Sequence, residues 1–229
     1  MGQKTNPVEL RLQLNGMKAT NVSWYASTRN YSTMLEQDMH ARNYINAHVK
    51  DAMITSIFIE RNTDAIRVNI NCAKPGAVTG KGGAGIQELH AGLLKYLSKK
   101  CNFTGKLKII IKEDKKYNAN LIAASIARQI VSRVNPKKAM RREIDRVIRS
   151  SNVKGIRIVV SGRIGGADIA RSEKQQVGRV PLHTLKANIQ YCSTTALTTY
   201  GIMGIKVWLF IEDNADSKQI KENTDAAAS

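Results

Sequence analysis

The stretch from Val78 to Leu89 reads VTGKGGAGIQEL and matches two different phosphate-binding motifs. Gly80, Gly82 and Gly85 fit G-x-G-x-x-G, the dinucleotide-binding fingerprint that connects a strand to a helix. The four residues from Gly80 to Gly83 fit G-x-x-G, a loop that clamps a nucleic-acid backbone between two helices. The first motif predicts an oxidoreductase and the second an RNA-binding domain, so the elements on either side of the loop decide the fold.

The residues around this loop favour the nucleic-acid clamp. The run KPG at 74–76 ends the preceding strand and leaves room for only one helical turn before Gly80. A dinucleotide fold would carry its strand directly into the first glycine and place an acid about 20 residues further on, whereas Glu113 comes 28 residues after Gly85. The predicted order is therefore α-β-β-α-α-β, with helices over 30–50, at the turn before Gly80 and over 86–100, and strands over 54–59, 65–71 and 107–112.

The charge of the chain indicates a polyanionic partner. There are 36 Lys and Arg residues against 18 Asp and Glu residues, which gives a formal net charge of +18. The segment 212–229 does not share this bias, because it holds five acids and two lysines. Self-repulsion in the remaining, more basic part opposes compaction unless a polyanion neutralises it. This favours nucleic acid or an anionic membrane surface as the partner, rather than a solitary basic enzyme.

Several other classes of protein are not supported. No run approaches the roughly 18 apolar residues of a membrane span, and residues 1–14 lack the apolar core of a secretory signal, so we expect a cytoplasmic protein without a membrane partner. The cysteines are far apart, and the helical histidines lack a ligand at metal spacing, so we expect reduced thiols, no metal and no cofactor. These residues are Cys72, Cys101, Cys192, His40, His48 and His90. Ser161 lacks the G-x-S-x-G setting of a hydrolase nucleophile, and we predict no catalytic residue.

The second half of the chain predicts another domain. The polar run DKKYN at 114–118 marks a boundary, and apolar residues then recur every fourth position from Ile122 to Val134, which predicts a helix that ends near Asn135. Pro136 begins a second helix with Asn135 as its N-cap. Strands are predicted over 155–164, over 184–191, where apolar and polar residues alternate, and over 205–211.

The helix predicted from Pro136 to Arg149 carries a candidate RNA-binding surface. Its apolar face consists of Met140, Ile144 and Val147. Cations project broadly opposite this face, namely Lys138, Arg141, Arg142, Arg146 and Arg149, with Lys137 at the start of the helix. Two acids alone interrupt them, so contact with a polyanion is at least as well supported as the usual alternative, a solvated basic face.

Two further segments combine glycines with cations. In SGRIGGADIARSEKQQVGRVPLH at 161–183, Arg163, Arg171 and Arg179 are interleaved with glycines, so guanidinium groups and backbone can reach a phosphate surface together. The alternative is a flexible loop with solvated arginines. In the glycine loop, Lys81 adds charge to backbone N–H groups that can approach phosphates closely. The alternative there is an ordinary glycine-rich turn at the start of a helix.

Five blocks of sequence together resemble one known family. They are MGQKTNP at 1–7, RVNINCAKPGAVTGKGG at 67–83, KGIRIVVSGRIGGADIARSE at 154–173, GRVPLHTLKANIQY at 178–191 and TTYGIMGIKVWLF at 198–210. In this order, and over nearly the whole chain to about Ile211, they resemble bacterial-type small-subunit ribosomal protein three. Agreement of several ordered blocks is far more specific than any single motif.

The resemblance implies an α+β protein with two domains. An N-terminal type II KH domain, which binds RNA, precedes a C-terminal α/β domain whose helices pack on a mostly antiparallel sheet. We expect an N-terminal extension over 1–16, the KH domain over 17–114, the C-terminal domain over 115–212 and an acidic, disordered tail over 213–229.

The resemblance also implies a role. It implies a structural constituent of the small-subunit head that binds rRNA, contacts ribosomal proteins ten and fourteen, and lines the mRNA entry channel, where the family's mRNA-unwinding residues match Lys137, Lys138 and Arg141. The alternative is a free-standing KH-domain regulator that is found off ribosomes. The expected RNA-binding residues are Gly80, Lys81, Gly82, Gly83, Lys137, Lys138, Arg141, Arg142, Arg163, Arg171 and Arg179.

Overall fold

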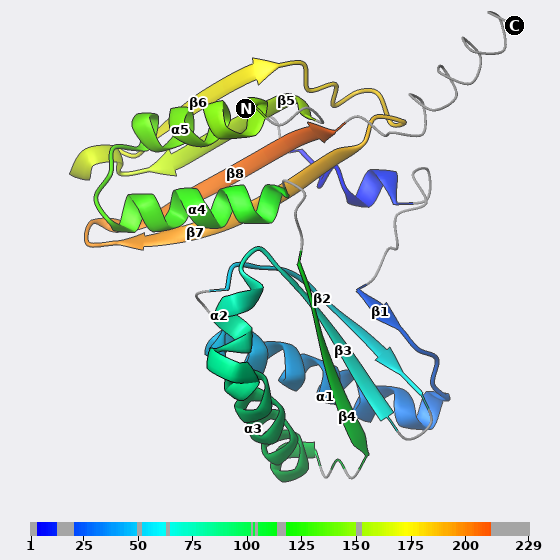
Figure 1. Cartoon of the computed structure of the whole chain (residues 1–229). Helices are drawn as coiled ribbons and strands as arrows, with labels where there is room; N and C mark the ends of the chain where they lie inside the picture. Colours follow the sequence, from blue (N-terminus) through cyan, green and yellow to red (C-terminus); the bar gives the residue numbers. More distant parts are fainter. Residues whose placement is uncertain are drawn as a thin grey trace, which may run out of the picture. The chain divides into compact units, whose positions relative to one another are not determined.

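The computed structural model describes residues 4–12, 21–49, 52–62, 65–101, 103, 105–113, 118–149 and 153–211 (Figure 1). The predicted acidic tail and the predicted boundary after residue 114 lie outside these residues. Internal contacts divide the chain into two compact units. One comprises Thr20–Lys116, and the other joins Met1–Ala19 to Tyr117–Ser229. Each unit is described by itself.

The N-terminal unit has the predicted order α-β-β-α-α-β, which is therefore confirmed. A four-stranded sheet of order β1-β2-β3-β4 has β2 antiparallel to β3, while β4 is parallel to β3 and β1 is parallel to β2. Its elements are β1 (Val22–Ser23), α1 (Thr28–His48), β2 (Ile54–Arg61), β3 (Ala65–Cys72), α2 (Pro75–Thr79), the 3₁₀ turn η2 (Lys81–Gly83), α3 (Ala84–Cys101) and β4 (Lys106–Glu113). Strand β1 was not predicted, because two residues are too short to show a period.

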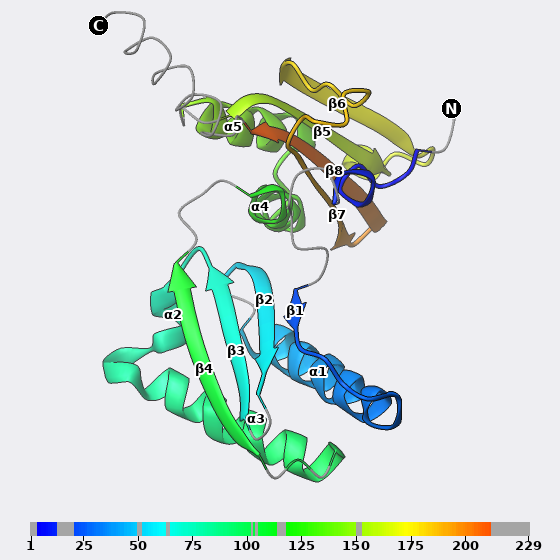
Figure 2. The ribbon, with the colours of Figure 1, turned by 90° about the vertical axis from the view of Figure 1, so that its right-hand side faces the viewer.

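Helices α1 and α3 lie on the same side of this sheet (Figure 2). Ile45 of α1 and Leu93 and Leu97 of α3 are fully buried, and they pack in one cluster with Ile57 and Ile59 of β2. The spacing of these residues, three or four along a helix and two along a strand, is what places them on facing surfaces.

A buried ion pair joins α1 to the sheet. Asp38 is 2 % exposed, and its carboxylate accepts hydrogen bonds from Trp24 Nε1 at 2.8 Å and from Arg61 Nε at 2.9 Å. Arg61 also donates through Nη1 to Gln37 Oε1 at 2.7 Å and through Nη2 to the Met34 carbonyl at 2.9 Å. Two opposite charges with this many hydrogen bonds satisfy each other away from water.

The C-terminal unit packs two helices on one face of an antiparallel sheet, as predicted. The strand order is β6-β5-β8-β7, and every neighbouring pair is antiparallel. The elements are α4 (Ala119–Val131), α5 (Pro136–Ile148), β5 (Val153–Gly162), the 3₁₀ turn η3 (Ile164–Gly166), β6 (Arg171–Gly178), β7 (Ile189–Thr198) and β8 (Gly201–Ile211). Helix α4 covers β7 and β8, and α5 covers β5 and β6 (Figure 1).

The strand predicted over 184–191 is wrong, because β7 begins only at Ile189. The preceding residues form a turn in which the Ala187 N–H donates to the Thr184 carbonyl at 3.3 Å. The carbonyls of Thr184 and Ala187 accept hydrogen bonds from the guanidinium of Arg11, at 3.0 Å each, so a neighbouring strand is not needed to satisfy them. An alternating pattern shows which side chains are polar, but it does not show which groups form hydrogen bonds with the backbone.

The segment 161–183 is not simply a loop, because it contains the edge strand β6. This strand pairs with β5 from Gly155↔Gly178 to Gly162↔Arg171. Its sequence, RSEKQQVG, has almost no apolar residues, so it shows no hydrophobic periodicity from which a strand could be predicted.

The helix predicted to reach Asn135 ends earlier, at Val131. Arg133 adopts a φ of +63° there, and the Val134 N–H donates back to the Gln129 carbonyl at 3.0 Å, which closes the helix.

Arg11 anchors the N-terminal segment on the C-terminal unit. It ends the short 3₁₀ helix η1 (Glu9–Arg11) and is 1 % exposed. Besides Thr184 and Ala187, it donates to the carbonyls of Pro7 and Leu182, both at 2.8 Å. Burial lowers the pKa of its guanidinium below the ordinary value.

Candidate nucleic-acid interface

The glycine loop follows a helix and not a strand, so the dinucleotide-binding alternative is wrong. Helix α2 ends at Thr79, and Gly80, with a φ of +68°, donates its N–H to the Gly76 carbonyl at 3.0 Å. A Cβ on Gly80 would lie 3.0 Å from the Gly85 nitrogen, and a Cβ on Gly85 would lie 2.6 Å from the Val78 carbonyl oxygen. These two glycines therefore allow α2 and α3 to approach closely.

The other two glycines of the loop face open space. Gly82 and Gly83 have φ angles of +62° and +82°, and a Cβ on either would meet nothing within 4 Å. A 3₁₀ turn that begins at Lys81 and continues through the left-handed Gly82 can form a backbone nest, in which successive N–H groups turn toward one anion. Helix α3 starts directly after it at Ala84, and Lys81 is exposed beside it. N–H groups, a helix N-terminus and a cation thus meet at one accessible place, which suits a phosphate.

Helix α5 presents the predicted basic surface. The Asn135 side chain accepts a hydrogen bond from the Lys137 N–H at 3.0 Å, and Pro136 takes the first helical position, as predicted. Met140, Ile144 and Val147 are buried against the sheet. The cations on the outer side are all exposed, namely Lys137, Lys138, Arg141, Arg142, Arg146 and Arg149.

Acidic neighbours neutralise only part of this surface. Lys137 Nζ lies 3.5 Å from Glu173 Oε1 of β6. Glu143 is 4 % exposed, because it turns inward to accept hydrogen bonds from Ser125 Oγ at 2.7 Å and Gln129 Nε2 at 2.8 Å. The other Glu143 oxygen, Oε2, lies 3.9 Å from Arg146 Nη1. Among the described residues, no carboxylate lies at ion-pair distance from Lys138, Arg141 or Arg142. The surface is therefore more positive than the sequence of the helix indicates.

The three arginines of the segment 161–183 do not form one cluster. Arg163 donates to the carbonyls of Ala167 at 2.9 Å and Tyr200 at 3.2 Å, so its guanidinium also holds its own loop in place. Arg171 begins β6, and its Cα partner is Gly162, the residue that precedes Arg163. Arg179 follows the far end of β6, roughly 25 Å from Arg171 at the usual rise of a strand.

Strand β6 extends the basic surface of α5. Glu173 pairs with Lys137, and Gln175 Nε2 donates to the Lys137 carbonyl at 3.4 Å. Alternate residues of a strand share a face, so Arg171 lies on the same side as these two. The sequence missed this neighbourhood because the partner of Lys137 lies in a strand without an apolar pattern.

An aromatic group on the helix-free face of the C-terminal sheet was also missed. The Arg157 guanidinium lies 5.1 Å from the centre of the Trp208 ring, and the Tyr191 ring lies 5.3 Å from it on the neighbouring strand. All three side chains are partly exposed. The sequence did contain a signal for this group, because Arg157 and Trp208 each stand between two apolar residues that are buried in β5 and β8.

Comparisons with known proteins agree with this architecture. Residues 40–116 match the family described as "KH domain", and residues 126–209 match "Ribosomal protein S3, C-terminal domain". The "Small ribosomal subunit protein uS3" of Novosphingobium aromaticivorans is 43% identical over 213 residues, which cover 92% of this chain and 88% of that protein. The protein of the same name from Bacillus cytotoxicus is 42% identical over 221 residues, 96% of each chain. The "Small ribosomal subunit protein uS3c" of Guillardia theta is 42% identical and covers 92% of this chain and 95% of its own.

These findings confirm the predicted KH domain, the C-terminal domain that follows it and the absence of enzymatic function, since the family is structural. No helix among the described residues is long and apolar enough to cross a membrane. With more than 40% identity over more than nine-tenths of its length, the chain belongs to the family of small ribosomal subunit protein uS3, a structural constituent of the ribosome.

Proposed function

We propose that the outer face of α5 contacts mRNA as it enters the small subunit, and that its cations hold the separated strands of mRNA hairpins. The observation that carries this proposal is the exposed row Lys138, Arg141 and Arg142, which no acidic group among the described residues neutralises. Residues three and four apart lie next to each other on a helix, so these side chains form one compact patch beside Lys137.

The chemistry of this patch suits binding to the phosphate backbone of RNA rather than recognition of a base sequence. Lysine and arginine bind phosphate oxygens without reading sequence, whereas base stacking requires aromatic rings. Helix α5, PKKAMRREIDRVI, has no aromatic residue. Contact with any message, whatever its sequence, is what a protein at an entry channel needs.

The other basic surfaces are proposed to bind rRNA. The loop Gly80–Gly83 offers its backbone nest and Lys81 to a phosphate, while Arg163, Arg171 and Arg179 serve the C-terminal unit. By family resemblance, the neighbouring proteins are ribosomal proteins ten and fourteen, on small subunits of the cytoplasm.

Replacing Lys137, Lys138 and Arg141 together with Ala should leave subunits assembled but slow translation through stable mRNA hairpins. Assembly should survive because exposed charge-to-Ala changes usually alter stability by less than about 0.5 kcal/mol each. Purified mutant ribosomes are compared on messages with and without a hairpin. The matched control exchanges the same residues for cations, Lys137→Arg, Lys138→Arg and Arg141→Lys, and should behave as wild type. Equal slowing on both messages, or none on either, contradicts the proposal.

Changing Lys81→Asp and Gly82→Asp should weaken binding of the full chain to rRNA fragments by about tenfold or more, because one charge-assisted hydrogen bond alone contributes about 1.5–3 kcal/mol. The backbone should accept the change, since aspartate tolerates the left-handed conformation and open space surrounds Gly82. Filter binding checks the affinity, and circular dichroism checks the fold.

A matched control for the loop places the same change of charge on the exposed side of α3, as Lys95→Asp with Gln87→Asp. If the loop and control variants lose affinity equally, the effect is one of net charge, and the loop makes no specific contact. Unchanged affinity of the loop variant would assign its glycines to packing alone.

The alternative that the sequence left open, a free-standing KH-domain regulator, is tested by the fraction of the cell in which the protein is found. Sedimentation of a cell lysate should place the protein with small subunits and translating ribosomes. A protein found mainly in the ribosome-free fraction would instead act as a separate RNA-binding regulator.

A further inference from the structure

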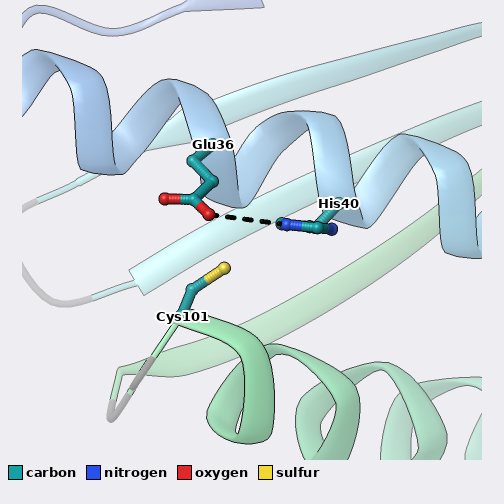
Figure 3. A group of neighbouring side chains, drawn as sticks. All are labelled: Glu36, His40 and Cys101. Carbon is teal, nitrogen blue, oxygen red and sulfur yellow. Dashed lines mark ion pairs between the residues drawn. The ribbon is translucent and has the colours of Figure 1, made fainter.

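Three side chains with metal-binding atoms meet between α1 and the end of α3, at Glu36, His40 and Cys101 (Figure 3). One ligand atom of each lies within 4.8 Å of those of the other two. All three residues belong to the N-terminal unit. Figure 3 shows the Cys101 thiol directed toward the Glu36–His40 pair. The sequence predicted no metal here because 60 residues separate His40 from Cys101, and spacing along the chain does not show contact.

Both ring nitrogens of His40 have polar neighbours. Its Nε2 lies 3.6 Å from Glu36 Oε1, one helical turn earlier, while Nδ1 lies 3.5 Å from the Tyr96 hydroxyl of α3. The Tyr96 ring meets the imidazole edge-on, with the ring centres 5.9 Å apart. A polar partner on the second ring nitrogen restrains the direction of the imidazole, as in ligating histidines.

The three residues are held by packed helices and are still open to solvent. Helices α1 and α3 contact each other directly, which places the last residue of α3 against the middle of α1. The His40 side chain is 28% exposed and that of Glu36 is 60% exposed. An ion can therefore reach the cluster, and the Glu36 carboxylate can rotate toward it.

We propose that Glu36, His40 and Cys101 bind one Zn²⁺ ion, with a fourth position left to water. Thiolate, imidazole and carboxylate together suit zinc, whereas Mg²⁺ and Ca²⁺ require oxygen ligands. Zinc ligands lie about 2.0–2.3 Å from the ion, and hence roughly 3.5 Å from each other. The 3.6 Å between Glu36 and His40 already meets this spacing, so binding requires a shift of about 1 Å by the thiol or the exposed carboxylate.

A bound ion would replace the proton of the Cys101 thiol, because zinc is ligated by the thiolate. The ion would cross-link α3 to α1, so it would stabilise the N-terminal unit without any catalytic role.

The test uses the full chain, reduced and freed of metal, titrated first with Co²⁺ and then with Zn²⁺. Cobalt serves as the probe because its bond to a thiolate gives a charge-transfer absorption. We expect one equivalent of Co²⁺ to produce this absorption, Zn²⁺ to displace it, and excess Mg²⁺ to leave it unchanged. Zn²⁺ should also raise the melting temperature, since it binds the folded state.

Matched variants separate this site from the other thiols and imidazoles. Cys101→Ser should abolish the absorption, and His40→Asn and Glu36→Gln should each weaken Zn²⁺ binding at least tenfold. The controls Cys192→Ser, His183→Asn and Glu88→Gln make the same chemical changes elsewhere and should bind as wild type. The proposal is overturned if the thiolate absorption does not form, if it persists in Cys101→Ser, or if any of the three site variants binds Zn²⁺ with unchanged affinity.

Discussion

Replacing Asp38 with Ala is expected to destabilise the N-terminal unit by about 3–5 kcal/mol, the usual cost of removing one partner from a buried ion pair. The Asp38 and Arg61 side chains are 3% and 7% exposed, so the guanidinium left behind would remain away from water without its counter-charge. The Trp24 indole would lose its acceptor as well. Because Arg61 keeps its bonds to Gln37 and to the Met34 carbonyl, the loss should fall in the lower part of that range.

Hydrogen exchange of the full chain is the appropriate measurement, because it reports on each unit separately. Amides of β2 and β3 should lose protection by about 100-fold or more, while those of β5 and β8 should not change. Asp38→Asn keeps an acceptor for Trp24 and should give a smaller loss. The control Glu88→Ala removes an exposed carboxylate from α3 and should be neutral. Protection that falls equally in both units, or in neither, would contradict the role assigned to this pair.

Binding of the full chain to small-subunit rRNA should weaken by about 10³-fold or more as salt rises from about 50 mM to about 200 mM. The physical reason is the release of counterions by each neutralised phosphate, and a loss of this size corresponds to about six to ten contacts. The net charge of +18 and the exposed cations of both units supply that many.

The slope of this salt dependence also tests individual residues. Each phosphate contact that a variant removes should reduce the slope of log affinity against log salt by about one. The Lys81→Asp and Gly82→Asp variant should therefore give a shallower slope than its control on α3. An affinity that barely changes over this range of salt would mean that phosphate contacts do not dominate the interface.

The elements of both units were predictable where periodicity and capping are local. The order α-β-β-α-α-β, the start of α5 at Pro136 and the buried face of Met140, Ile144 and Val147 follow from residues close together in the chain. Such signals belong to one helix or strand and do not depend on what it packs against. The same is true of the glycine loop, whose helix-loop-helix setting followed from the break at Pro75.

The prediction of strands failed where residues far along the chain supply the hydrogen-bond partners of the backbone. Strand β6 exists because β5 pairs with it, although its residues are polar. Residues 184–188 alternate as a strand does, yet Arg11 satisfies their carbonyls from more than 170 residues away. Backbone groups need partners, and a local pattern does not show where those partners lie.

The sequence by itself determined the family, the glycine loop between two helices, the basic face of α5 and the sign of the charge, because these depend on composition and on local order. The tertiary structure decided how the charged groups combine. It turned Glu143 into the core, paired Lys137 with Glu173, separated Arg179 from Arg171, and brought Cys101 to His40 and Glu36. Electrostatic and ligand interactions act over a few ångströms of space, and only the folded chain sets those distances.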